Sequence, residues 1–265
     1  MIKPEKLRDK FWLWGHTAGS HDKGWGFDKK SRMTPAESAY YLGIKKVFMV
    51  CYANKPEPPF DQDAMALDSM NEVVWSIVGD ASSSANIETY GHLDEILRIA
   101  GKFPNTTGAI FDDFFSQNEN REALYTPEVL RHIRGKLHEK NLDMWTVLYD
   151  TNLDKPITEH LAEFDGVGYC TWLGDDLPKF DEDFRKAREL AKGKRLIVGC
   201  YLYNYGQFRE FKAADMEMQL EKFAGLIREG VSEGITLCSN CVADLGFEAV
   251  EYTKQWLKEH GDELI

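Results

Sequence analysis

Features that would direct a chain to a membrane, a nucleic acid or a dinucleotide are missing from this sequence of 265 residues. No apolar run approaches the roughly 18 residues of a membrane-spanning helix. Positive charge is scarce: 32 Lys and Arg face 44 Asp and Glu, and the net charge of -12 repels nucleic acids and anionic membranes. The segment 15–26 lacks the G-x-G-x-x-G spacing of a dinucleotide-binding loop. We therefore predict neither a membrane nor a nucleic-acid partner.

Cysteine is too sparse for a disulfide framework. The five cysteines are an odd number, and most lie in apolar runs, which indicates buried free thiols in a reducing compartment. Cys238 and Cys241 form a C-x-x-C pair without a second pair or a His at zinc-like spacing, so a metal or redox role is only an alternative. We predict no metal and no cofactor. Segment 1–15 lacks the apolar core of a secretion signal, so we expect a cytoplasmic location unless a signal has been removed.

What is present is the composition of an ordinary globular protein. The chain is 43% hydrophobic and 29% charged, without a low-complexity tract or a Pro/Gly/Ser linker that would divide it. We therefore predict one domain over residues 1–265, with a large core.

Short β-type runs alternate with helical segments along the chain. The runs begin at residues 11, 46, 73, 108, 143, 166, 195 and 234. Each interval fits one βα unit, and eight units in about 250 residues are typical of an α/β fold of the (β/α)8 TIM-barrel type. A doubly wound open sheet is the competing fold, but it would place a Gly-rich phosphate loop after its first strand.

The intervening segments carry helix signals. The stripe Leu93, Ile96, Leu97 and Ala100 has the spacing of a helix that covers a sheet. Segment 34–37 combines a capping Thr, a Pro at the first helical position and a Glu that can reach back to the cap. A closing helix is expected over about 247–264.

In a TIM barrel the active site forms where the strands end, and here those positions carry aromatic rings and carboxylates but no Lys or Arg. The lack of cations disfavours phosphorylated substrates. Single aromatic residues there are often core residues, and Asp80, Asp175 and Asp176 could instead cap helices. Rings beside hydroxyls, amides and acids suit a neutral sugar. The predicted substrate-binding residues are Trp14, His16, Tyr52, Trp75, Tyr149, Trp172, Asp175, Tyr201, Tyr203 and Asn240.

The stretch "GAIFDDFF", residues 108–115, ends an apolar strand in two adjacent acids. About a dozen residues separate Asp113 from the next helix cap at Thr126, so neither acid can be that cap. Hydrolysis of a glycosidic bond uses a pair of acids. Because neighbouring side chains of a strand alternate between faces, an outward Phe111 would turn Asp112 into the barrel. Asp113 would then orient the loop or a substrate hydroxyl, unless a bulge exchanges the two.

The same alternation, applied to the next strand with Trp145 and Val147 outward, turns Asp150 inward. Asp112 and Asp150 would then lie on neighbouring strands and perturb each other's pKa. The predicted catalytic residues are Asp112, Asp113 and Asp150.

With its acids at the tip of the fourth strand, "GAIFDDFF" resembles barrel glycoside hydrolases of the α-galactosidase type and, more loosely, of the chitinase type. The resemblance implies Asp112 or Asp113 as the fourth-strand acid and Asp175 or Asp176 as the sixth-strand acid. The chain departs from chitinases, because it has no run of spaced acids ending in Glu at the fourth strand. The prediction is an enzyme that cleaves a glycosidic bond in a small-molecule or oligosaccharide substrate.

Two other functions stay open. A metal-dependent barrel hydrolase or isomerase could use His16, His21 or His92 with the aspartates, although the histidines lack the H-x-H spacing of amidohydrolases. A non-catalytic carbohydrate-binding barrel would need only the aromatic rings.

Overall fold

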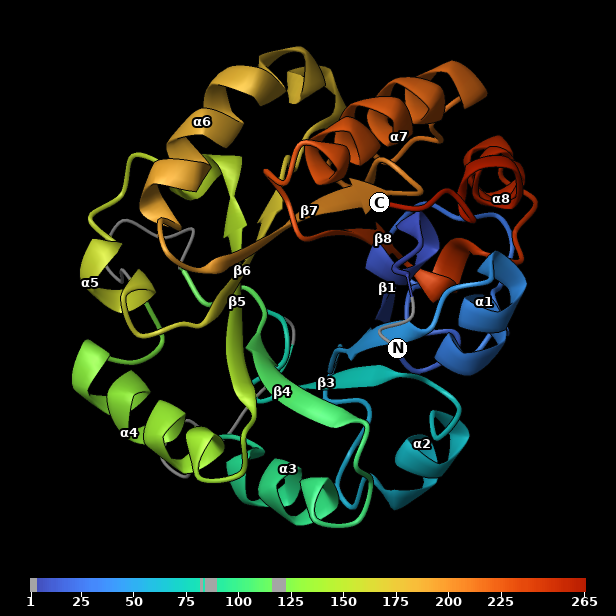
Figure 1. The fold of residues 1–265 in the computed structure, drawn as a ribbon. Helices are drawn as coiled ribbons and strands as arrows, with labels where there is room; N and C mark the ends of the chain where they lie inside the picture. Colours follow the sequence, from blue (N-terminus) through green and yellow to red (C-terminus); the bar gives the residue numbers. More distant parts are fainter. Residues whose placement is uncertain (1–3, 82, 84–89, 116–122) are drawn as a thin grey trace.

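The computed structural model describes residues 4–81, 83, 90–115 and 123–265, and its centre is a closed barrel of eight parallel strands. Each strand pairs with the next, and the last pairs with the first (Figure 1). The strands are β1 Phe11–Gly15, β2 Lys46–Met49, β3 Glu72–Ser76, β4 Thr106–Phe111, β5 Asp143–Tyr149, β6 Gly166–Cys170, β7 Arg195–Tyr201 and β8 Gly234–Cys238. The predicted TIM barrel is confirmed.

Helices form the outer ring in Figure 1. Thr34 and Glu37 make the predicted capping box at the first helix, whereas the Thr126 side chain makes no capping bond at the fourth. None of the helices in the described ranges is long and apolar enough to cross a membrane. The α-helices are α1 Pro35–Leu42, α2 Asp61–Ala66, α3 Leu93–Ala100, α4 Pro127–His138, α5 Thr158–Leu161, α6 Phe180–Leu190, α7 Ala213–Arg228 and α8 Glu248–His260.

The barrel interior has its own apolar cluster, separate from the layer between strands and helices. It contains Trp12, Phe48, Val50, Val74, Ile110, Trp145, Val147 and Ile197. The predicted outward direction of Trp145 and Val147 is therefore wrong. In the register of β4 and β5, Trp145 lies beside the inward Ile110, and side chains at paired positions share a face. Gly166 makes room for the indole, because a Cβ there would come within 2.2 Å of the Trp145 ring.

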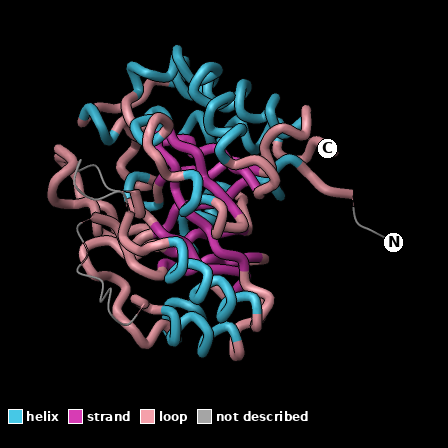
Figure 2. The backbone as a smooth tube through the Cα atoms, turned by 90° about the vertical axis from the view of Figure 1, so that its left-hand side faces the viewer, coloured by secondary structure: helices cyan, strands magenta, loops and turns pink. Residues whose placement is uncertain are grey.

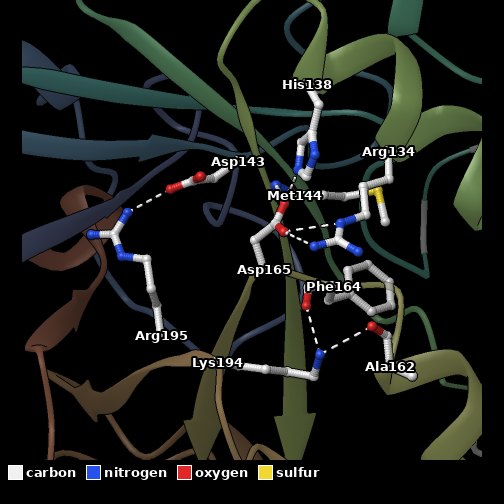
Figure 3. Close-up of polar contacts among 9 residues, drawn as sticks. All are labelled: Arg134, His138, Asp143, Met144, Ala162, Phe164, Asp165, Lys194 and Arg195. Atoms are coloured by element: carbon white, nitrogen blue, oxygen red, sulfur yellow. Dashed lines mark hydrogen bonds and ion pairs between the residues drawn. The ribbon is translucent and has the colours of Figure 1, made fainter.

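Ion pairs cover the amino end of the barrel (Figure 3). Asp165, which precedes β6, accepts from the Arg134 guanidinium at 2.5 Å and from the His138 ring at 2.8 Å. Asp143 at the start of β5 pairs with Arg195 at the start of β7, at 2.6 Å. The Arg195 guanidinium also lies 4.7 Å from the centroid of the Trp145 ring. These contacts stabilise the end of the barrel opposite the candidate site.

The carboxyl ends of the strands lead into the longer loops. Figure 2 shows loop segments gathered at one side of the barrel, away from the two chain termini. The termini meet where the Leu7 amide donates to the Glu263 carbonyl at 2.9 Å. The loop side is therefore the place where a site can form without disturbing the barrel core.

Candidate active site

A pocket of about 930 Å³ opens at the carboxyl end of the barrel. Asp80, Asp112 and Asp113 provide its carboxylates. No Lys or Arg lines it within the described part of the chain. The larger aromatic side chains of its wall are Trp14, Trp25, Tyr52, Tyr149, Trp172, Tyr201 and Tyr205.

The two acids of "GAIFDDFF" both line this pocket. The regular strand stops at Phe111, and Asp112, only 5% exposed, follows it. Asp113 adopts a φ of +45°, in the left-handed region, so the chain bends there and the strict alternation of faces ends. Its amide donates to Oδ1 of Asp112 at 3.0 Å. The alternation of faces predicted that only one of the two acids would face the barrel. Because of the bend, both carboxyl groups reach the same cavity.

The phenylalanines around the acids hold this bend against the helical layer. Phe111 contacts Phe114 with ring centroids 5.3 Å apart, and both lie 5.5 Å from Phe164 in edge-to-face geometry. Phe111 and Phe114 have no exposed surface. The predicted loop that follows runs through residues 116–122, which lie outside the described ranges.

Burial and neighbouring charge raise the pKa of both aspartates. For Asp112 the pKa rises well above 3.8, first through burial and then through the charges of Asp113 and Asp80. For Asp113 burial is again the largest cause. Hydrogen bonds from the Tyr149 hydroxyl, 3.5 Å from Asp112 Oδ1, oppose the rise only in part. The two carboxyl groups titrate as a pair that retains a proton at higher pH than an ordinary aspartate.

Asp80, beyond the end of β3, is a third acid that the predicted site did not include. Its Oδ1 accepts from the Ser83 hydroxyl at 2.8 Å and from the Ala53 amide at 3.3 Å. Its charge raises the pKa of both Asp112 and Asp113. The sequence placed Asp80 at a strand tip, but a capping role competed with a role in the site.

Two neutral histidines lie on the side of the pocket formed after β1. Burial lowers the pKa of His16 to about 4 and that of His21 to about 2. His16 Nδ1 lies 3.1 Å from the Val50 carbonyl, and His21 Nδ1 lies 3.2 Å from the Tyr205 hydroxyl. His92 does not line the pocket; its ring packs against Phe60. Among the described residues, no group of three or more His, Cys, Asp or Glu side chains could hold a metal ion.

The pocket gathers six of the ten predicted substrate-binding residues, and their role in binding stays a prediction. These six are Trp14, His16, Tyr52, Tyr149, Trp172 and Tyr201. Tyr149 and Tyr201 each contact Trp172 edge-on, with centroids 6.0 Å apart, so one wall is continuous across β5, β6 and β7.

Three other predicted residues have structural contacts instead. Trp75 is 1% exposed and stacks on Phe60 outside the barrel, at 5.2 Å, because its strand position faces the helices. Tyr203 is buried and stacks on Phe247. The fully buried Asn240 accepts from the His16 amide and donates to the His16 carbonyl, which joins the end of β8 to the end of β1.

Asp150, Asp175 and Asp176 are not in the pocket either. Asp150 begins a short 3-10 helix and accepts from the amides of Thr151 and Trp172. Burial and the charges of Asp176 and Asp183 raise its pKa, and a mutual pKa effect between Asp112 and Asp150 stays a prediction. Asp175 and Asp176 form surface ion pairs. Neither lines the pocket, and a role as the sixth-strand acid of the α-galactosidase pattern stays a prediction.

Sequence reasoning missed two aromatic residues of the pocket, Trp25 and Tyr205. Trp25 lies in the loop after β1, and its indole N–H donates to the Tyr52 hydroxyl at 3.2 Å. Tyr205 contacts it edge-on at 5.1 Å. Neither residue belongs to a strand, so strand periodicity could not indicate them; a Trp between two glycines, Gly24 and Gly26, was the available signal.

The five cysteines are free thiols, and three of them, Cys51, Cys200 and Cys241, are buried. Cys170 and Cys238 line the pocket. Burial raises the pKa of Cys170 to about 12 and that of Cys238 well above its usual range. Both thiols are therefore protonated at neutral pH and poor nucleophiles.

No protein-family model matches the chain, and a search of curated proteins finds no match. Solved structures are similar in fold. The spore cortex-lytic enzyme SleL of Bacillus megaterium QM B1551 matches with a TM-score of 0.59 and 13% identity, over 99% of this chain and 76% of that one. A chitinase of Chromobacterium violaceum matches with a TM-score of 0.57 and 12% identity, over 92% and 98%. A mutant tryptophan synthase α-subunit of Pyrococcus furiosus matches with 0.55 and 11%, over 96% and 98%. At these identities the likeness shows the TIM-barrel fold.

Proposed function

We propose that this chain is a glycoside hydrolase that cleaves a bond of a neutral sugar with Asp112 and Asp113. One observation carries the proposal: the buried Asp112 and its half-buried neighbour Asp113, both with raised pKa values, line an aromatic pocket at the carboxyl end of β4. Carboxyl groups displaced to higher pKa in a cleft are characteristic of functional sites.

The pair can supply both proton transfers of hydrolysis. A protonated Asp112 donates its proton to the glycosidic oxygen as the bond from that oxygen to the anomeric carbon breaks. Water then adds to the anomeric carbon, and the proton that water loses returns to the pair. The raised pKa keeps the donor protonated at a pH where an ordinary aspartate has lost its proton.

The lining of the pocket supports a neutral ligand. The C–H faces of a sugar ring pack on aromatic rings, and Trp172, Tyr149 and Tyr201 form a wall of such rings. The described lining contains three carboxylates and no cation to bind a phosphate. We propose a small-molecule glycoside or an oligosaccharide as substrate.

Two of the similar structures bear the names of a cortex-lytic enzyme and a chitinase, which is compatible with this proposal. The tryptophan synthase α-subunit also shares the fold, with a TM-score of 0.55, so the proposal depends on the site and not on the fold.

The test is a screen of the purified protein against neutral 4-nitrophenyl glycosides and oligosaccharides, with release of nitrophenol and of new reducing ends as readouts. We expect turnover of at least one glycoside that persists in the presence of EDTA. Turnover lost with EDTA and restored by a divalent metal would favour the metal-dependent alternative.

A non-catalytic carbohydrate-binding barrel is the second candidate, favoured by the aromatic wall alone. Calorimetry separates it from an enzyme: saturable sugar binding without turnover of any glycoside in the screen would contradict the hydrolase and support the binding protein.

A further inference from the structure

An exposed phenylalanine extends the aromatic wall beyond the pocket. Phe208, in the segment after β7, is 57% exposed, and its ring lies 5.8 Å from Trp25 at an interplanar angle of 31°. Trp25 in turn lies 6.2 Å from Trp172. Trp25 and Trp172 line the pocket, and Phe208 does not. We name Trp25, Trp172 and Phe208 the outer aromatic cluster.

The backbone at Phe208 adopts a conformation that is unfavourable in free energy. Its φ of +53° lies in the left-handed region, which large side chains rarely adopt. Asn204 and Arg209 pair across this turn, with the Asn204 amide 3.0 Å from the Arg209 carbonyl. A strained turn that presents an exposed apolar ring points to a function for the ring.

Two hydrogen bonds and one close packing contact fix the turn against the segment that carries Trp172. Asp175 accepts from Arg209 at 2.6 Å and from Gln207 at 2.5 Å. Gly206 packs on Trp172 so closely that a Cβ there would lie 2.8 Å from the Trp172 carbonyl oxygen. The neighbouring β6 and β7 (Figure 1) thus present Trp172 and Phe208 as one preformed surface.

We propose that the outer aromatic cluster is a second sugar-binding subsite, and that the substrate is therefore a neutral oligosaccharide rather than a single sugar. The inference rests on the proposed function, in which Asp112 and Asp113 act on the unit inside the pocket. The next unit of the chain leaves the pocket past Trp25 and Trp172 and packs on the Phe208 ring.

The test compares wild-type protein with Phe208→Ala on cello-, chito- and malto-oligosaccharides of one to six units. Binding is measured by calorimetry, and kcat/KM from new reducing ends. For the series that binds, we expect Phe208→Ala to weaken the binding of the longer oligosaccharides about tenfold and to leave the binding of the single sugar unchanged. Phe208→Tyr keeps a ring and should retain the wild-type length dependence. Tyr40→Ala, which removes an 83% exposed ring on α1, should have no effect.

The outcomes separate this inference from the proposed function. A Phe208-dependent gain of affinity with length but no turnover supports the subsite and contradicts the hydrolase. Turnover combined with an affinity that Phe208→Ala lowers equally for short and long oligosaccharides, or does not lower at all, overturns the subsite and leaves the hydrolase. Absence of a length-dependent gain in all three series also overturns the subsite. Because Phe208 is exposed, the variant should fold, and an unchanged Tm checks this.

Discussion

The backbone amide of Asp113 donates to the carboxyl group of Asp112 at 3.0 Å, so two consecutive residues share a hydrogen bond and a pocket. This geometry follows from the left-handed conformation of Asp113 directly after a buried strand. The result is a pair of acids whose pKa values are raised, first by burial and then by neighbouring carboxylates.

The buried carboxyl group of Asp112 should lower the stability of the fold at pH values where it is ionised. Its folded pKa is raised, so the folded chain binds more protons than the unfolded chain between pH 3.8 and that raised value, and stability falls as pH rises through this window. Asp112→Asn removes the buried charge and should therefore raise Tm at pH 7, with a smaller gain at pH 4. Each 1 kcal/mol corresponds to about 2–4 °C in a domain of this size. A lower Tm for Asp112→Asn at pH 7 would contradict the assignment.

The charge of Asp80 should set part of the pKa of Asp112 and Asp113. Its carboxylate raises the pKa of both aspartates, so Asp80→Asn should lower the pKa of the proton donor. The alkaline limb of the kcat/KM profile should then move to lower pH. Asp154→Asn, which neutralises an exposed acid outside the pocket, is the matched control and should leave the profile in place. An alkaline limb at the same pH in Asp80→Asn as in the wild type would show that Asp80 does not affect the proton donor.

Trp172 should bind the sugar through its ring face. Loss of the indole removes apolar contact worth on the order of 1–3 kcal/mol, so Trp172→Ala should weaken sugar binding roughly tenfold to a hundredfold. Isothermal calorimetry measures this, and Tyr40→Ala serves as a control for a surface ring. Unchanged affinity would show that Trp172 does not contact the ligand.

Asp150 should be dispensable for chemistry. Its carboxyl accepts from the Thr151 amide at 2.9 Å and from the Trp172 amide at 3.3 Å, and an Asn oxygen can accept both bonds. We expect Asp150→Asn to keep kcat within about threefold of wild type. A loss of several orders of magnitude would restore Asp150 as a catalytic residue.

The order and starts of the strands could be predicted because each strand of a parallel barrel is an apolar run bounded by helix signals. Six of the eight predicted starts match the observed ones, and β3 and β4 differ slightly, at Glu72 and Thr106. The face of the barrel to which each side chain points could not be predicted as well. It depends on the register between strands, and the pairing of Ile110 with Trp145 cannot be read from either strand alone.

The site was predictable at strand tips and not in loops. Asp112 directly follows β4 and Trp172 lies just beyond the end of β6, so their meeting at one end of the barrel follows from the fold. Trp25 and Tyr205 reach the pocket through loop conformations fixed by hydrogen bonds from distant elements, such as the bond from the Tyr203 hydroxyl to the Trp25 carbonyl. Those contacts exist only in the folded chain.

The most direct test of the central claim is the turnover of purified, folded Asp112→Asn and Asp113→Asn on whichever glycoside the wild type cleaves, with Asp154→Asn as control. Substitution by Asn keeps the shape of each side chain but removes its proton transfer. We predict that turnover falls on the order of 10²–10⁴-fold in Asp112→Asn, with substrate affinity largely retained, and is also strongly reduced in Asp113→Asn. Full activity in both variants would contradict the account.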